Sequence, residues 1–167
     1  MKTVKKIINA ALDIIIVFLL IINILNLTGV ITIGIVNGES MLNTFHDGDF
    51  VIAVKQSSYK NNDIVFAENT DKTYEVIKRV IATPGQTIQI INGQVYIDDV
   101  LLKEDYLSSN KDITINKIIL GKNQYYIMGD NRNNSYDSRN YGPVTIDKIL
   151  GKVNYPRLKH LGFLLHR

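Results

Sequence analysis

The feature that most constrains this chain is a long apolar segment close to its N-terminus. Ile7–Leu27 consists mostly of Ile, Leu, Val and Phe, and its run from Ile14 to Ile22 is wholly apolar. A helix needs about 20 such residues to cross a bilayer, so the segment predicts a transmembrane anchor within residues 1–28. Lysines hold the adjacent end of a span in the cytoplasm. The lysines before the segment therefore predict a cytoplasmic N-terminus and an extracytoplasmic domain over residues 29–167: Lys2, Lys5 and Lys6.

A cleavable signal peptide is the competing interpretation of this segment, because its uninterrupted apolar run is short. Such peptides end in a small-x-small cleavage site. Asn23-Ile24-Leu25-Asn26-Leu27-Thr28-Gly29 follows the run and contains no such site. The sequence therefore favours an anchor that is retained.

The rest of the chain is long enough for one domain with a hydrophobic core. The sequence contains no Cys, so disulfides cannot stabilise it, and the net charge is only +3. Apart from the N-terminal lysines, the basic residues are scattered, with no basic stripe between aromatic residues. This distribution argues against a nucleic acid as partner.

Short β-branched and apolar runs separated by turn signals dominate this domain. They predict an all-β fold, an antiparallel sheet or barrel preceded by one N-terminal transmembrane helix. Asn92-Gly93 between two alternating runs is the strongest hairpin signal. A weakly patterned stretch, about 98–117, is interpreted as a loop-rich insertion. The expected strands are 30–36, 50–54, 63–67, 74–82, 87–91, 94–97, 118–120 and 124–128, with a last turn or strand within 146–153.

Ser40, in Gly38-Glu39-Ser40-Met41, is a candidate nucleophile. A serine hydroxyl reacts only when a base removes its proton, and histidine is the usual base. His46 is close in sequence, but no third orienting group accompanies it and the second Gly of a nucleophile elbow is missing. We therefore interpret His46 as a surface or packing residue.

Lys78 is the alternative base, in the strand-like run 74–80. Side chains alternate along a strand, so Lys78 shares a face with Val76 and Val80, while Arg79 lies on the other face. Burial among apolar groups lowers the pKa of a lysine from about 10.4, which leaves a neutral amine that can accept a proton. The pattern alone is equally that of a surface lysine on an edge strand.

Together with Gly129-Asp130-Asn131-Arg132-Asn133-Asn134-Ser135-Tyr136-Asp137-Ser138-Arg139, these two stretches resemble the type I signal peptidases. One anchor and a short domain resemble the Gram-positive form. The resemblance implies a membrane-bound serine endopeptidase, with Ser40 as nucleophile and Lys78 as general base and no metal or cofactor. Its partners would be the lipid bilayer and exported preproteins whose signal peptides carry small-x-small residues before the cleavage site.

The resemblance also assigns supporting roles. The oxyanion would be held by the backbone N–H of the nucleophile, and Gly38 stands where some members carry a second, serine donor, so a backbone N–H would have to replace it. Ser135 matches a hydroxyl that orients the lysine amine. Asp137 and Arg139 match an ion pair that braces the site, with Arg79 as a candidate third member. Asp130 and Asn131 are interpreted as loop-shaping residues.

The family binds substrate as an added strand with pockets for alternate side chains. Val36, Met41 and Ile77 are our candidates for lining these pockets; the same residues would equally suit a hydrophobic core. Two positions depart from the family pattern, in which proline is usual at the position of Asn43 and aspartate at that of Gln86. Both departures concern loop geometry rather than chemistry.

Two other functions fit part of the pattern. Self-cleaving repressors use the same Ser-Lys dyad, but they are cytosolic and DNA-linked, which the anchor argues against. A non-catalytic, membrane-anchored β module that escorts exported or surface proteins would lack the dyad, whereas Ser40 and Lys78 are both present.

Overall fold

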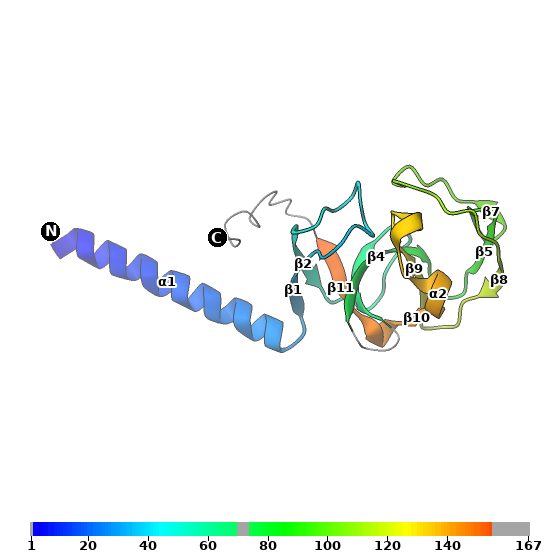
Figure 1. Cartoon of the computed structure of the whole chain (residues 1–167). Coiled ribbons are helices and arrows are strands. Elements are labelled where there is room, and N and C mark those ends of the chain that lie inside the picture. The colour runs from blue at the N-terminus through cyan, green and yellow to red at the C-terminus, as the bar shows by residue number, and fades with distance from the viewer. Residues whose placement is uncertain (1, 70–73, 155–167) are drawn as a thin grey trace.

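A single helix stands apart from a β domain (Figure 1). The computed structural model of the protein describes residues 2–69 and 74–154. The helix α1 (Lys2–Leu27) is mostly apolar, and from Thr3 to Leu27 none of its side chains is buried against the domain. At 1.5 Å per residue its 26 residues extend about 39 Å, more than the roughly 30 Å of a hydrocarbon core. The helix ends at Leu27, and Gly29 just beyond it has a φ of 70°, the left-handed conformation that terminates helices.

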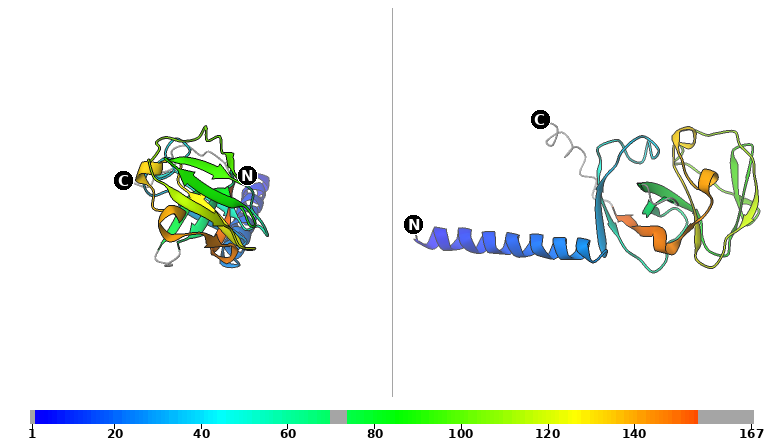
Figure 2. Two further views of the ribbon diagram at one scale, coloured as in Figure 1. Left: turned by 90° about the vertical axis from the view of Figure 1, so that its right-hand side faces the viewer. Right: turned by 60° about the horizontal axis from the view of Figure 1, so that its bottom comes forward.

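The β domain consists of two antiparallel sheets, the larger of which is curled (Figures 1 and 2). This architecture confirms the predicted all-β class. The smaller sheet lies at the end of the domain remote from α1 (Figure 2). Its strands, in spatial order, are β7 (Val100–Leu101), β6 (Gln94–Ile97), β5 (Thr87–Ile91) and β8 (Ile115–Ile119). Those of the larger sheet are β1 (Ile31–Ile35), β2 (Phe50–Val54), β11 (Ile149–Asn154), β3 (Ile64–Glu68), β4 (Glu75–Ala82), β9 (Gln124–Met128) and β10 (Val144–Thr145).

Strand β4 is buried on both faces because the larger sheet curls around it. Ile77 packs into one apolar cluster, while Val76 and Val80 pack into another. Lys78 and Arg79 follow each other along this strand and are exposed by only 3 % and 8 %. The alternation that the sequence predicted holds, but neither face of β4 opens to solvent at these two residues.

The predicted strands agree with the observed ones to within a few residues, and the 92–93 hairpin is confirmed, with positive φ at both turn residues. Strand β8 begins earlier than expected, inside the predicted insertion, because Ile115 pairs with Ile90 of β5. Two short helices in the loop after residue 128 were not predicted: η1 (Arg132–Asn134) and α2 (Ser138–Tyr141). The predicted last turn or strand within 146–153 is a 3₁₀ turn, η2 (Ile146–Lys148), followed by β11.

Candidate active site

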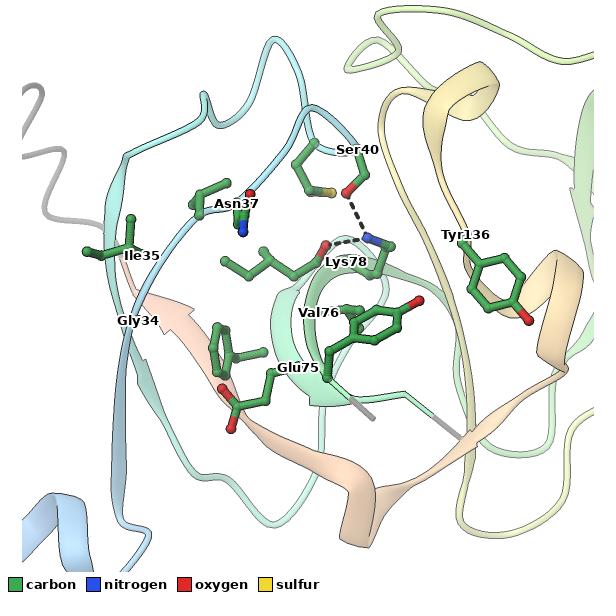
Figure 3. Close-up of a pocket in the computed structure, with 13 residues that line it drawn as sticks. Gly34, Ile35, Asn37, Ser40, Glu75, Val76, Lys78 and Tyr136 are labelled. Atoms are coloured by element: carbon green, nitrogen blue, oxygen red, sulfur yellow. Dashed lines mark hydrogen bonds between the residues drawn. The ribbon is translucent and has the colours of Figure 1, made fainter. Parts of the chain in front are cut away.

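The fold brings Ser40 and Lys78 into direct contact (Figure 3). Ser40 lies in the turn that follows β1, and Lys78 lies on β4. The Lys78 Nζ donates a hydrogen bond to Ser40 Oγ at 2.7 Å and a second to the carbonyl of Ile77 at 3.1 Å. A serine hydroxyl and an amine at this distance are within reach of proton transfer.

The surroundings of Lys78 favour its neutral form. Burial lowers the pKa of the amine to about 8, while the Asp137 carboxylate raises it and the Arg139 guanidinium lowers it. Neither of the two hydrogen-bond acceptors of Lys78 carries a formal charge. Desolvation therefore dominates, because a buried ammonium has lost its water shell without gaining a carboxylate in direct contact.

The loop after β9 fixes the backbone of the nucleophile. The Asn131 backbone N–H donates to the carbonyl of Ser40 at 3.0 Å, and the Asn131 side-chain amide donates to the carbonyl of Glu39 at 3.2 Å. Any side chain at Gly129 would collide with the Ser40 carbonyl and the Ser135 hydroxyl. Asn131 therefore does more than shape its own loop, which its place in a polar run did not indicate.

Asp137 and Arg139 form the expected ion pair, with both carboxylate oxygens 2.8 Å from guanidinium nitrogens. Burial alone would raise the pKa of Asp137, but Arg139, together with the Gly129 N–H and the Ser135 hydroxyl, lowers it below its ordinary value. The Ser135 hydroxyl donates to Asp137 Oδ2 at 2.7 Å. Among the described residues it makes no hydrogen bond to Lys78, so the predicted direct contact is wrong. The hydroxyl donates its hydrogen bond to Asp137 because an ionised carboxylate is a strong acceptor.

Arg79 belongs to a different ion pair from the expected one. Its Nε and a terminal nitrogen bind the two oxygens of Asp130 at 2.8 and 2.7 Å, and Asp130 is fully buried. The Thr44 hydroxyl donates to the same carboxylate, and the guanidinium lies 4.0 Å from the centre of the Tyr106 ring. Asp130 thus ties β4 to the segment that carries the nucleophile, a role that sequence reasoning missed.

A second buried pair joins Arg132 of this loop to Glu104 of the insertion. The Tyr106 hydroxyl donates to Glu104 at 2.6 Å. Burial raises the pKa of Tyr106 well above its ordinary value. Nothing in the weakly patterned insertion distinguished Glu104 from a solvated acid. The pairing depends on the path of the chain, which no local periodicity encodes.

A cavity of about 520 Å³ extends from the Ser40–Lys78 contact between β1 and β4 (Figure 3). The three predicted pocket residues all line it: Val36, Met41 and Ile77. Gly34 lines it as well, and a side chain there would collide with the Phe66 ring. The remaining lining residues are Ile35, Asn37, Ser40, Phe66, Tyr74, Glu75, Val76, Lys78 and Tyr136.

Gly38 and His46 are close to the nucleophile in sequence, and within the described ranges neither forms a hydrogen bond with its hydroxyl. The Gly38 N–H donates to Asp47 Oδ1 at 2.8 Å, so it is already engaged. Within the described ranges, the Ser40 N–H donates to no acceptor. The His46 side chain is 67 % exposed, 4.0 Å from Asp49, in accord with a surface residue. The described residues contain no cluster of His, Cys, Asp or Glu that could hold a metal ion.

The two departures from the family pattern have local explanations. Asn43 has a φ of 74°, which proline cannot adopt and asparagine tolerates, so the turn after Ser40 differs from one that contains proline. The Gln86 side chain accepts hydrogen bonds from the Thr83 N–H and hydroxyl, both at 2.9 Å. It closes this turn as a carboxylate would.

A serine hydroxyl in contact with a buried, neutral-prone lysine on a curled antiparallel sheet is the arrangement of a Ser-Lys hydrolase. Residues 7–157 match the family described as signal peptidase, peptidase S26. Signal peptidase I T of Bacillus subtilis (strain 168) is 35% identical over 136 residues, which cover 72% of this chain and 70% of the relative. Signal peptidase I of Bacillus licheniformis is 37% identical over 130 residues, 68% of each chain.

The solved structures agree with the sequence relatives. A crystal structure of a signal peptidase I from Enterococcus faecalis superposes with a TM-score of 0.52 at 28% identity, covering 59% of this chain and 98% of that one. The chain therefore belongs to the signal peptidase family, peptidase S26, and is a serine endopeptidase. The resemblance read from its sequence is confirmed, and α1 fits the membrane anchor of such an enzyme.

Proposed function

We propose that this protein removes signal peptides from exported preproteins at the membrane, with Ser40 as nucleophile and Lys78 as general base. The observation that carries the assignment is the 2.7 Å contact between Lys78 Nζ and Ser40 Oγ at an amine whose pKa is lowered to about 8. A pKa of about 8 is close to neutral pH, and a general base works efficiently when its pKa is near the working pH.

The reaction proceeds in two halves. The neutral Lys78 amine takes the Ser40 hydroxyl proton as Oγ bonds to the scissile carbonyl carbon. The resulting ammonium gives that proton to the leaving amine as the peptide bond breaks, leaving an acyl-enzyme ester and a neutral lysine. Lys78 then deprotonates a water that attacks the ester, and returns the proton to Ser40 Oγ.

The developing oxyanion needs donors that are not already engaged. The Ser40 N–H meets this condition among the described residues, whereas the Gly38 N–H is held by Asp47. Asn131 holds the Ser40 carbonyl, which fixes the orientation of the turn that presents the nucleophile. We assign the oxyanion contact to the Ser40 N–H and a supporting role to Asn131.

An open strand edge supports binding of the signal peptide as an added strand. Strand β9 pairs with β4 only from Arg79 onward, so in the described sheet residues 75–78 pair with β3 alone. Val80 bonds toward the β3 side through both its N–H and its C=O. By alternation, the backbone groups of Glu75 and Ile77 face the open edge. Small substrate side chains, the small-x-small pattern, would then enter the cavity beside Val36, Met41 and Ile77.

The proposal places α1 across the membrane, with the lysines of its first two turns in the cytoplasm and the domain from residue 29 outside. Protease added to wall-stripped cells should digest the domain while the membrane remains intact. Complete protection of the domain until detergent is added would contradict this topology.

The decisive experiment is cleavage of a preprotein by the full chain reconstituted in lipid vesicles. The wild type should release the mature protein at a bond preceded by small-x-small residues, and Ser40→Ala should release none. Equal cleavage by both proteins, or none by a correctly inserted wild type, would overturn the proposed function.

A further inference from the structure

One acidic side chain lines the substrate cavity at the end remote from the nucleophile. Glu75 is exposed and lies near Gly34 and Ile35, while Ser40 and Lys78 are at the opposite end (Figure 3). Glu75 is three positions before Lys78 on an extended strand, a distance of about 10 Å along β4. The cavity thus extends past the pockets at Val36 and Ile77 to a carboxylate.

No positively charged side chain among the described residues pairs with Glu75. Its cross-strand partner is Glu68, so two acidic residues lie directly opposite each other on one face of the sheet. Like charges in this arrangement are destabilising. Lys148 lies 3.7 Å from Glu68, and no cation of the described chain forms an ion pair with Glu75. A cation brought by another molecule would remove the repulsion.

The rest of this end of the cavity suits a long cationic side chain. Tyr74, which precedes Glu75 in the chain, lines the cavity and is 50% exposed, which leaves ring surface available to a cation. The Phe66 ring lies against Gly34 and offers an apolar surface for an aliphatic stem. Lysine and arginine combine such a stem with a charged head.

We infer that Glu75 forms a further subsite, which selects a lysine or arginine in the substrate upstream of the small residues. The inference rests on the proposed function, because it needs a peptide strand along β4 with its scissile bond at Ser40. At about 3.3 Å per residue, a strand whose last residue before the cut is level with Lys78 brings its fourth or fifth residue level with Glu75. A carboxylate that is merely solvated would confer no such preference.

The test uses peptide substrates that differ at one position and the full-length enzyme in detergent micelles. One series carries Lys, Met or Glu at the fourth residue before the cut, and a second carries them at the fifth; Met matches Lys in length without the charge. The enzymes are the wild type, Glu75→Gln and Glu75→Lys. Asp112→Asn is the control, since it removes one exposed negative charge before β8, outside the cavity lining.

In one of the two series the wild type should cleave the Lys peptide with a kcat/KM about threefold to fivefold above that of the Met peptide, as expected for a partly exposed ion pair. About 1 M salt should abolish this ratio. Glu75→Gln should bring the ratio to one, Glu75→Lys should favour the Glu peptide, and Asp112→Asn should keep the wild-type ratio. Equal cleavage of all peptides by the wild type, or an unchanged ratio in Glu75→Gln, would overturn the subsite alone. A wild type that cleaves no peptide of either series would overturn the proposed function as well.

Discussion

Lys78 and Arg79 are neighbours on β4, both buried, yet the protein treats their charges in opposite ways. Arg79 lies on one face of the strand with both oxygens of Asp130 bound to its guanidinium. Lys78 lies on the other face, where its amine contacts a hydroxyl and a backbone carbonyl. Both residues are buried, but only the charge of Arg79 is balanced by a carboxylate in direct contact.

This difference separates a structural cation from a chemical one. A buried guanidinium with a bidentate carboxylate keeps its charge and joins two segments of the chain. A buried amine without such a partner loses affinity for its proton, which lowers the pKa of Lys78 to about 8. Alternation along the strand assigns the two roles to consecutive residues.

The largest expected effect comes from removing the catalytic lysine or its serine partner. Ser40→Ala and Lys78→Ala should each lower kcat/KM by about 10⁴-fold or more, and the double variant should be hardly worse, because the two residues act as one unit. Preprotein cleavage in vesicles measures this. His46→Ala is the control and should retain activity; a large loss there, with an active Lys78→Ala, would instead support a Ser-His mechanism.

Removing Arg79, the structural cation, should lower the stability of the fold. Arg79→Ala leaves the fully buried Asp130 without its ion-pair partner and should lower the free energy of unfolding by about 3–5 kcal/mol. Denaturant unfolding of the detergent-solubilised chain measures this. Lys103→Ala, which removes a lysine from an exposed pair with Asp105, should leave the unfolding midpoint unchanged. Equal unfolding midpoints for the two variants would mean that the Arg79–Asp130 pair does not stabilise the fold.

Removing the uncompensated amine should stabilise the protein while abolishing its activity. The folded pKa of Lys78 is below the unfolded one, so between about pH 8 and 10.5 the unfolded chain binds more protons and wild-type stability rises with pH. Below that window the buried ammonium destabilises the fold. Lys78→Met should therefore raise the free energy of unfolding at pH 7 by about 1–3 kcal/mol and lose the rise above pH 8. A lower midpoint than that of exposed Lys60→Met would contradict this.

The pH–rate profile sharpens the assignment of the base. The active fraction has Lys78 neutral, so kcat/KM should rise about tenfold per pH unit from pH 6 and reach half its maximum near pH 8. A histidine base would place this midpoint near 6.5. A soluble signal-peptide substrate suits the measurement, and a plateau already reached by pH 6.5 would exclude a lysine of this kind.

The smallest expected effect concerns Ser135, which contacts Asp137 rather than the amine. Ser135→Ala should lower kcat/KM by about threefold to tenfold. Loss of the Ser135 hydroxyl would let the Asp137 carboxylate shift, and the position of that carboxylate affects the pKa of Lys78. The midpoint of the pH–rate profile should move with it. Exposed Ser57→Ala is the control. A loss as large as that of Lys78→Ala would mean that Ser135 contacts the amine during catalysis.

Much of the fold followed from local patterns. An apolar stretch of membrane-spanning length predicted α1, and period-two runs between turn residues predicted most strands of the domain. The hairpin at Asn92-Gly93 followed because both residues tolerate positive φ. Each of these features depends on neighbours within a few residues, which is why sequence alone determined them.

The site divides along the same line. Sequence named Ser40 and Lys78 and put Lys78 and Arg79 on opposite faces of one strand, since alternation is local. Tertiary structure alone decided that Asp130 compensates Arg79, that Ser135 donates to Asp137, and that Glu104 reaches Arg132. These choices depend on which segments the curled sheet and the loop after β9 bring together. A charge finds its partner through the packing of distant residues, and no spacing along the chain encodes that distance.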